Sequence, residues 1–189
     1  MSRLFLVRHG PTHAKSMVGW SDLPADLSDT AALARLEAFL PTKAHIVSSD
    51  LSRAVETANA IQGDRNRLPH VFDLREMHFG DWELKTHTDV EDKEHMMAFW
   101  DTPGDIRPPK GESWNEVVAR VDAAIDSLLQ NADGHDLVIV CHFGVIVTQI
   151  QRALRLTPYE AFGHKISNLS VTVIDTASDW LTEHINHNP

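Results

Sequence analysis

An unbroken apolar run at residues 137–141 (LVIVC) is the feature of this sequence that most restricts its fold. Such a run predicts a strand covered on both faces, as in the centre of a parallel sheet. Two other short runs, at residues 3–7 and 45–48, predict further buried strands. Parallel strands need crossover connections, so the segments between these runs must supply helices that cover the sheet.

Helical patterns do occur between the predicted strands. Ser28 is a candidate N-cap for a helix that Pro41 ends, and a second helix is expected from about Asp50 onward. Ser113 and Glu116 have the spacing of a capping box, which predicts a third long helix. Another helix is expected directly after the central run, following residues 142–144.

The remaining elements have weaker patterns. Residues 70–72 are predicted to form the third strand, residues 89–100 a helix, and residues 169–175 and 180–185 two final strands. Strands that alternate with helices predict a three-layer α/β/α sandwich with a mostly parallel central sheet. A length of 189 residues without a long linker predicts one domain over residues 1–189.

Charge and cysteine content exclude several classes of protein. The chain has 17 Lys and Arg against 27 Asp and Glu, a net charge of −10, so its overall field repels nucleic acids and anionic membranes. The single cysteine, Cys141, has no partner for an intramolecular disulfide, and no apolar run is long enough to span a membrane. The N-terminus lacks the pattern of a signal peptide. We therefore expect a cytoplasmic protein, either a monomer or a homodimer.

Arginine and histidine side chains come directly after the predicted strands. Arg8 and His9 follow the first strand, Arg53 lies about one turn into the helix after the second, and His142 follows the central run. Ligands of open α/β sheets bind beyond the carboxyl ends of the strands, so these residues are candidates for one site. Guanidinium groups match phosphate oxygens, and imidazole supplies a nucleophile or a proton donor. The set favours phosphoryl transfer, although each motif alone is also typical of a solvated turn.

Four segments, in order along the chain, resemble the motifs of the histidine phosphatase superfamily, which includes phosphoglycerate mutases and many small phosphatases. They are residues 6–10 (LVRHG), 48–58 (SSDLSRAVETA), 74–76 (LRE) with 79–83 (FGDWE), and 140–146 (VCHFGVI). The first motif alone is weak support, whereas four motifs in the family's order are specific. The resemblance implies a phosphoglycerate mutase-like fold, in agreement with the sandwich predicted above.

The resemblance also implies a role for each matching residue. His9 would attack phosphorus to give a phosphohistidine that water hydrolyses, and Arg8, Arg53 and His142 would bind the phosphoryl oxygens. Glu76 would protonate the leaving alkoxide, which requires a raised pKa, whereas His9 must be neutral to attack. This chemistry implies neither a metal nor another cofactor.

The first loop departs from the family pattern at two positions. Pro11 stands where glutamate is usual, and Lys15 stands where asparagine often contacts phosphate. Lys15 would supply positive charge instead of an amide. The hydroxyl of Thr12, three residues after His9, is expected to reach a phosphate oxygen. Both Thr12 and Lys15 are therefore candidates for substrate binding.

Residues 77–84, with 86–89 and 110–113, are similar to the branch of the family that hydrolyses α-ribazole-5′-phosphate in cobalamin assembly. The segment between Glu76 and His142 is shorter than in the mutases, which favours hydrolysis. We expect a phosphomonoesterase acting on a small phosphorylated metabolite, with about residues 77–110 covering the substrate. The alternatives are mutase-type phosphoryl transfer, a phosphohistidine protein phosphatase and a non-catalytic phosphate-binding module.

Several other residues have both a functional and a structural interpretation. His13 and His78 either bind the rest of the substrate or lie on the surface. Trp82, Trp100 and Trp114 either form an aromatic wall around a pocket or pack in the core. Cys141 is expected to pack as a small apolar residue at the end of its strand.

Overall fold

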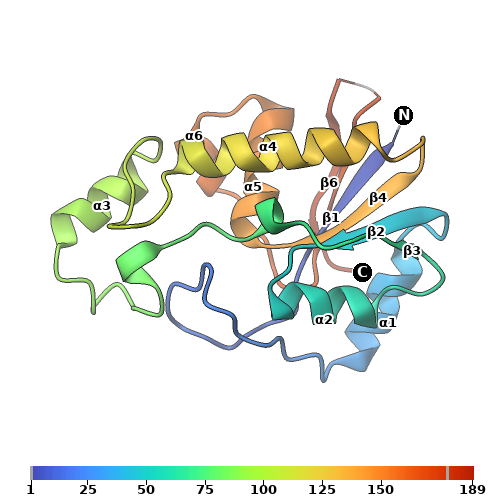
Figure 1. Ribbon diagram of the computed structural model, residues 1–189, viewed down its shortest axis with the longest axis horizontal. Coiled ribbons are helices and arrows are strands. Elements are labelled where there is room, and N and C mark those ends of the chain that lie inside the picture. The colour runs from blue at the N-terminus through green and yellow to red at the C-terminus, as the bar shows by residue number, and fades with distance from the viewer. Residues whose placement is uncertain (1, 178) are drawn as a thin grey trace.

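The computed structural model describes residues 2–177 and 179–189, and at its centre is a six-stranded sheet with the order β3-β2-β4-β1-β5-β6 (Figure 1). The strands are β1 (Arg3–Arg8), β2 (Ala44–Ser48), β3 (Asn66–Arg67), β4 (Asp136–Cys141), β5 (Val171–Asp175) and β6 (Leu181–His187). β4 pairs in parallel with β1 and β2, and β2 pairs in parallel with β3. β5 is antiparallel to both of its neighbours, β1 and β6. The sheet is mixed but mostly parallel, as predicted.

Helices cover both faces of this sheet, which confirms the predicted three-layer sandwich (Figure 1). The helices are α1 (Thr30–Phe39), α2 (Ser52–Ala60), α3 (Lys93–Asp101), α4 (Trp114–Gln130), α5 (Phe143–Leu154) and α6 (Pro158–Phe162), with two short 3₁₀ turns, η1 (Phe72–Leu74) and η2 (Gly80–Trp82). The side chains of α1 and α2 form one apolar core with the sheet, and those of α4 and α5 form the other.

The alternation of side chains along the central strands divides them between these two cores. In β1, Leu4 and Leu6 belong to the core under α4 and α5, whereas Phe5 and Val7 belong to the core under α1 and α2. The residues of β4 divide in the same way, with Ile139 on one face and its neighbours on the other. Residues 137–141 are therefore apolar at every position because both faces of β4 are covered.

The predicted third strand at residues 70–72 is wrong. β3 comprises Asn66 and Arg67, and residues 72–74 form η1 instead. Leu68 still donates to the carbonyl oxygen of Ile46 (2.9 Å), but the next donor to β2 is Val71 in place of His70, so the regular register is lost there. The N–H of Val71 donates once more to the carbonyl oxygen of Ser48 (3.0 Å) before the chain turns away.

Two predicted helix starts are displaced by a capping residue. The side chain of Asp29, rather than Ser28, caps α1 by accepting from the N–H of Ala32 at 2.9 Å. α3 begins only after Asp92, because Asp89 instead accepts hydrogen bonds from Thr86. The capping box of Ser113 and Glu116 at the start of α4 is confirmed.

Two long segments without strands lie beyond the carboxyl ends of β1, β2 and β4, at residues 9–29 and 77–110 (Figure 1). The second contains η2 and α3. Any site at this edge of the sheet is therefore bordered by both segments. Within the described residues, no helix has both the length and the apolar character needed to cross a membrane.

Candidate active site

Adjacent parallel strands bring the two motif histidines together. His9 follows β1 and His142 follows β4, and the backbone N–H of His9 donates to the carbonyl oxygen of Cys141 at 3.0 Å. The two imidazole rings have centroids 5.1 Å apart. Both residues are buried, with 6% and 0% of their surface exposed. The strand pairing thus places both side chains at the carboxyl edge of the sheet, where a ligand is expected.

The contacts of His9 define which of its ring nitrogens carries the proton. Nδ1 lies 2.7 Å from the carbonyl oxygen of Gly10, and because a carbonyl only accepts, Nδ1 carries the proton. Nε2 therefore has the lone pair. Burial, together with the charges of Arg53 and Arg8, lowers the pKa of His9 to about 3. At neutral pH the imidazole is uncharged, which is the state that nucleophilic attack requires.

This low pKa predicts a pH dependence of stability. Below its usual pKa of 6.5, His9 binds a proton in the unfolded chain but not in the folded one, so stability falls as pH falls from 6.5 toward 3. The slope for this one group is about 1.4 kcal/mol per pH unit. We expect His9→Asn to reduce the slope of the unfolding free energy by that amount between pH 6 and about pH 5. Urea denaturation at several pH values measures it, and equal slopes for both proteins would contradict the assignment.

Two guanidinium groups border the histidines. Arg53 is 1% exposed in the first turn of α2, where its Nη2 and Nη1 donate to the carbonyl oxygens of Gly19 (2.6 Å) and Ser21 (2.8 Å). Arg8 donates from Nη1 to Ile166, and its buried Nε has no partner among the described residues. Burial lowers the pKa of both groups, but arginine keeps its charge at neutral pH. The site therefore offers fixed positive charge to an anion.

A single carboxylate fixes the loop that holds Arg53. The two oxygens of Glu83 accept from the backbone N–H groups of Gly19 (3.1 Å), Trp20 (2.8 Å) and Ser21 (3.2 Å), and from the hydroxyl of Ser21 (2.6 Å). The carbonyl groups of the same loop bind the Arg53 guanidinium. Glu83, part of a segment that the sequence singled out, therefore connects the loop to Arg53 through backbone contacts.

His142 is held by a serine that the sequence analysis did not select as a site residue. Its Nε2 lies 2.7 Å from the hydroxyl of Ser49, whereas its Nδ1 is buried and has no partner within the described part of the chain. Burial and the nearby His9 lower the pKa of His142 well below its usual value. Ser49 comes directly after β2, and that position was the available signal for it. Nδ1 of His142 is left as a polar atom able to contact a phosphoryl oxygen.

Glu76 approaches the same edge from an irregular segment between η1 and η2. Its carboxylate accepts from the backbone N–H of Met77 (2.9 Å) and from that of Gly144 in the first turn of α5 (3.0 and 3.2 Å). The approach is close enough that a Cβ atom at Gly144 would lie 2.3 Å from Oε1 of Glu76, so a side chain there would displace the Glu76 carboxylate. Burial raises the pKa of Glu76, while these hydrogen bonds and the charges of Arg53 and Arg8 act in the opposite direction.

Two of the predicted substrate-binding residues are not connected to the other candidate site residues by hydrogen bonds or ion pairs within the described part of the chain. Thr12 is half-buried and Lys15 is exposed, and neither makes a hydrogen bond or ion pair with other described residues. His13 instead pairs with Asp26 at 2.7 Å and lines a cavity of about 350 Å³ together with Pro11. None of the five catalytic candidates lines that cavity. The roles of Thr12 and Lys15 stay predictions.

The aromatic residues divide between core and site border. Trp82 and Trp114 are buried in the core, and Trp100 packs against the same core, which confirms the structural interpretation of all three. His78 packs edge-to-face on Trp20, with ring centroids 4.5 Å apart. Cys141 is fully buried, and burial raises the pKa of its thiol, so it packs as a small apolar residue as predicted. Within the described residues, no group of three or more potential ligands is arranged to hold a metal ion.

Five side chains from four separate segments thus form what we call the catalytic cluster, which comprises Arg8, His9, Arg53, Glu76 and His142. It combines a neutral imidazole, the buried guanidinium of Arg53, the half-buried guanidinium of Arg8 and a carboxyl group with a raised pKa. Phosphoryl transfer from a phosphate ester requires positive charge and a proton donor, and side chains of both kinds are present in the cluster. The arrangement is suited to phosphoryl transfer.

Comparison with known proteins agrees with this class. Residues 4–186 match the family model of the histidine phosphatase superfamily (branch 1), so the chain belongs to that superfamily. The adenosylcobalamin/alpha-ribazole phosphatase of Salmonella typhimurium is 30% identical over 189 residues, covering 95% of this chain and 93% of the relative. A probable phosphoglycerate mutase, GpmB of Yersinia enterocolitica, is 30% identical over 204 residues, covering 97% and 92%. The solved structure of Bacillus stearothermophilus YhfR superposes with a TM-score of 0.89 at 28% identity, covering 98% of this chain and 97% of that one.

These findings confirm three predictions made from the sequence. The resemblance to the superfamily, the phosphoglycerate mutase-like fold and the class of phosphoric monoester hydrolase are all supported.

Proposed function

We propose that this protein hydrolyses the phosphate ester of a small metabolite through a phosphohistidine on His9. The observation that carries the proposal is the buried, neutral imidazole of His9, whose Nδ1 is held by Gly10 and whose Nε2 has the lone pair. Two guanidinium groups and His142 lie around it. This combination suits attack on a phosphorus atom whose oxygens are held by fixed positive charge.

The reaction proceeds in two displacements. In the first, Nε2 of His9 forms a bond to phosphorus while the ester P–O bond breaks, and the leaving oxygen takes the proton of Glu76. In the second, a water molecule attacks the phosphohistidine, the P–N bond breaks, and the Glu76 carboxylate accepts a proton from the water. Inorganic phosphate is released, and both residues return to their starting states. Arg8 and Arg53 neutralise phosphoryl oxygens throughout.

For the leaving group, we propose the alcohol of α-ribazole, so that the substrate is α-ribazole-5′-phosphate. The support is the similarity of residues 77–84 to that branch and the relatives named as alpha-ribazole phosphatases. Residues 77–110 lie beyond the carboxyl ends of the strands (Figure 1), and this position supports the proposal that they cover the substrate. We also propose that residues 1–189 act as one catalytic domain in the cytoplasm. Measurement of the molecular mass in solution distinguishes a monomer from a homodimer.

Mutase activity is the second candidate, because several relatives are named probable phosphoglycerate mutases. A mutase must retain its phosphohistidine until the product alcohol is phosphorylated, which requires exclusion of water. A hydrolase must admit water to the same atom. The two candidates therefore differ in the fate of the phosphohistidine and not in how it forms.

A substrate panel tests the proposal. We expect the highest kcat/KM for α-ribazole-5′-phosphate, with release of inorganic phosphate, and no interconversion of phosphoglycerates. The panel includes glycerol phosphate, 3-phosphoglycerate and a phosphohistidine protein. A specificity constant for the phosphoprotein far above those for the metabolites would overturn the small-molecule assignment, and isomerisation of 3-phosphoglycerate without phosphate release would favour the mutase.

A further inference from the structure

The segment that carries Glu76 has no regular secondary structure to hold it. Residues 75–78 lie between η1 and η2, so no helix or ladder there satisfies their backbone carbonyl groups. A carboxyl group that donates a proton in a reaction must nevertheless be held within a fraction of an ångström of its place. Something outside the segment has to supply that rigidity.

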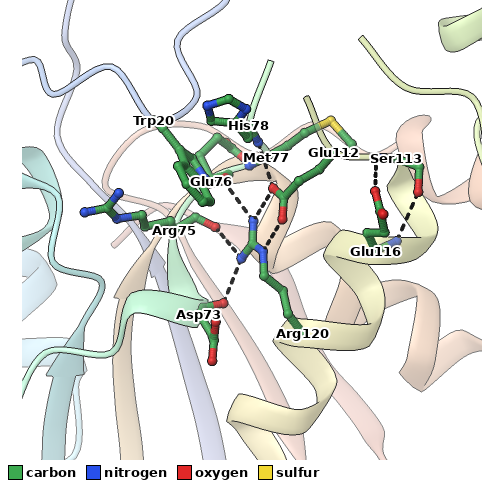
Figure 2. A network of polar contacts seen from close by, with 10 residues as sticks. All are labelled: Trp20, Asp73, Arg75, Glu76, Met77, His78, Glu112, Ser113, Glu116 and Arg120. Carbon is green, nitrogen blue, oxygen red and sulfur yellow. Dashed lines mark hydrogen bonds and ion pairs between the residues drawn. The ribbon is translucent and has the colours of Figure 1, made fainter. Parts of the chain in front are cut away.

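Figure 2 shows that the guanidinium group of Arg120, on α4, reaches this segment. Its Nη1 donates to the carbonyl oxygens of Asp73 (2.8 Å) and Arg75 (2.9 Å), and its Nη2 donates to that of Glu76 itself (3.0 Å). The indole Nε1 of Trp20 donates to the same Glu76 oxygen at 2.8 Å. The backbone of Glu76 is therefore held by two donors from distant parts of the chain.

Glu112 orients this guanidinium group and also binds the backbone of the same segment. Its carboxylate accepts from Nε (2.7 Å) and Nη2 (2.8 Å) of Arg120, so all five donor positions of the guanidinium are used. The same carboxylate accepts from the backbone N–H of His78 at 2.8 Å, and the N–H of Glu112 donates to the His78 carbonyl at 2.9 Å. The two side chains are largely buried, with 15% and 19% exposed. The chain is thus held on both sides of Glu76.

We propose that Arg120 and Glu112 are positioning residues that hold the acid Glu76 against the catalytic cluster. The inference rests on the proposed function, in which Glu76 protonates the leaving group. α4 packs beside α5, and the indole of Trp114 donates to Gln151 between them at 2.7 Å. Arg120 therefore fixes the Glu76 backbone relative to α5, whose Gly144 contacts the Glu76 carboxylate. Loosening the pair moves the proton donor but leaves His9, Arg8 and Arg53 in place.

The test uses the dependence of the rate on the leaving group. A misplaced acid slows the departure of an alkoxide, which needs a proton, far more than that of p-nitrophenolate, which does not. We expect Arg120→Met to lower kcat/KM for glycerol phosphate by about 10- to 100-fold and for p-nitrophenyl phosphate by less than about 3-fold. Glu112→Gln should show the same split with a smaller loss. On the Glu76→Gln background, Arg120→Met should cause no further loss for glycerol phosphate.

Arg65 provides a matched control at the opposite end of the sheet. Its side chain is also buried, and it binds the carbonyl oxygens of Pro41 (2.7 Å), Leu40 (2.8 Å) and Ile61 (3.1 Å) near the start of β2. We expect Arg65→Met to lower the melting temperature without changing the ratio of the two kcat/KM values. An equal loss on both substrates for a folded Arg120→Met, or the same split for Arg65→Met, would overturn the inference.

The remaining outcomes are also decisive. If Arg120→Met does not fold, Glu112→Gln replaces it in the test, because this variant retains the Arg120 guanidinium group. An unchanged ratio of the two kcat/KM values in Glu112→Gln would then refute the positioning role of Arg120 and Glu112. If Glu76→Gln itself shows no leaving-group dependence, the acid role in the proposed function is wrong. If Glu76→Gln shows the dependence and both other variants lack it, only the positioning role is wrong.

Discussion

Replacement of His9 by alanine is expected to lower turnover by at least about 10⁴-fold and to abolish the phosphoenzyme. The loss is large because Nε2 of His9 is the atom that forms the bond to phosphorus, and no other group in the cluster is placed to take over. His142 has its Nε2 engaged by Ser49 and presents only Nδ1. Rapid acid-free quenching of the enzyme with ³²P-labelled substrate, followed by peptide mapping, measures the intermediate.

The label itself provides the control for this prediction. A phosphohistidine is stable to base and labile to acid, which separates it from phosphoserine and acyl phosphate. His142→Ala should still give this label on His9, but more slowly, because it loses a phosphoryl contact and keeps the nucleophile. A label that maps to another residue, or a His9→Ala variant with full turnover, would refute the covalent mechanism.

Glu76→Gln is expected to lower kcat/KM for alkyl phosphates by about 10²- to 10⁴-fold, with a much smaller loss for p-nitrophenyl phosphate. Glutamine keeps the size of the side chain but has no acidic proton. The pH profile should change as well. Burial raises the pKa of Glu76, so the protonated acid persists to higher pH and activity falls as pH rises through that pKa. This descending limb should be absent from the variant.

Two comparisons isolate the effect of Glu76. The substrate phosphate titrates identically with both enzymes, so only the difference between their profiles reports on the carboxyl group. Glu37→Gln serves as the matched control, because Glu37 pairs with Arg65 (3.1 Å) at the opposite end of the sheet from the cluster. It should change neither the profile nor the ratio between substrates. Equal losses on both substrates in Glu76→Gln would mean that Glu76 is not the proton donor.

The alternation of strands and helices was readable because its signals are local. A strand covered on both faces has apolar residues at every position, as residues 137–141 do, and capping residues such as Ser113 mark the start of a helix within four residues. The weak elements failed for equally local reasons. The chain slips by one residue after Leu68, so that Val71 takes the place of His70 as the donor to β2, and Asp29 displaced Ser28 as the cap of α1.

Much of the candidate site was predictable for a topological reason. In a parallel sheet, residues directly after strands meet at one edge, so Arg8, His9 and His142 could be grouped before any distance was known. Glu76 is different. It follows no strand, and its carboxylate meets Gly144, which is 68 residues further along the chain. Only the resemblance to the superfamily pointed to it.

The sequence by itself therefore determined the layers of the fold, the edge where the site forms and the residue types that perform the chemistry. The tertiary structure alone decided the strand order β3-β2-β4-β1-β5-β6 and the devices that fix the site. Glu83 holds the loop that binds Arg53, and Arg120 with Glu112 holds the backbone of Glu76. The contacts of Arg53 and Glu83 with that loop, and of Arg120 with the Glu76 segment, join side chains to backbone carbonyl and N–H groups across 32 to 64 residues. Backbone groups are the same at every position, so the sequence carries no pattern that identifies which of them a distant side chain will bind.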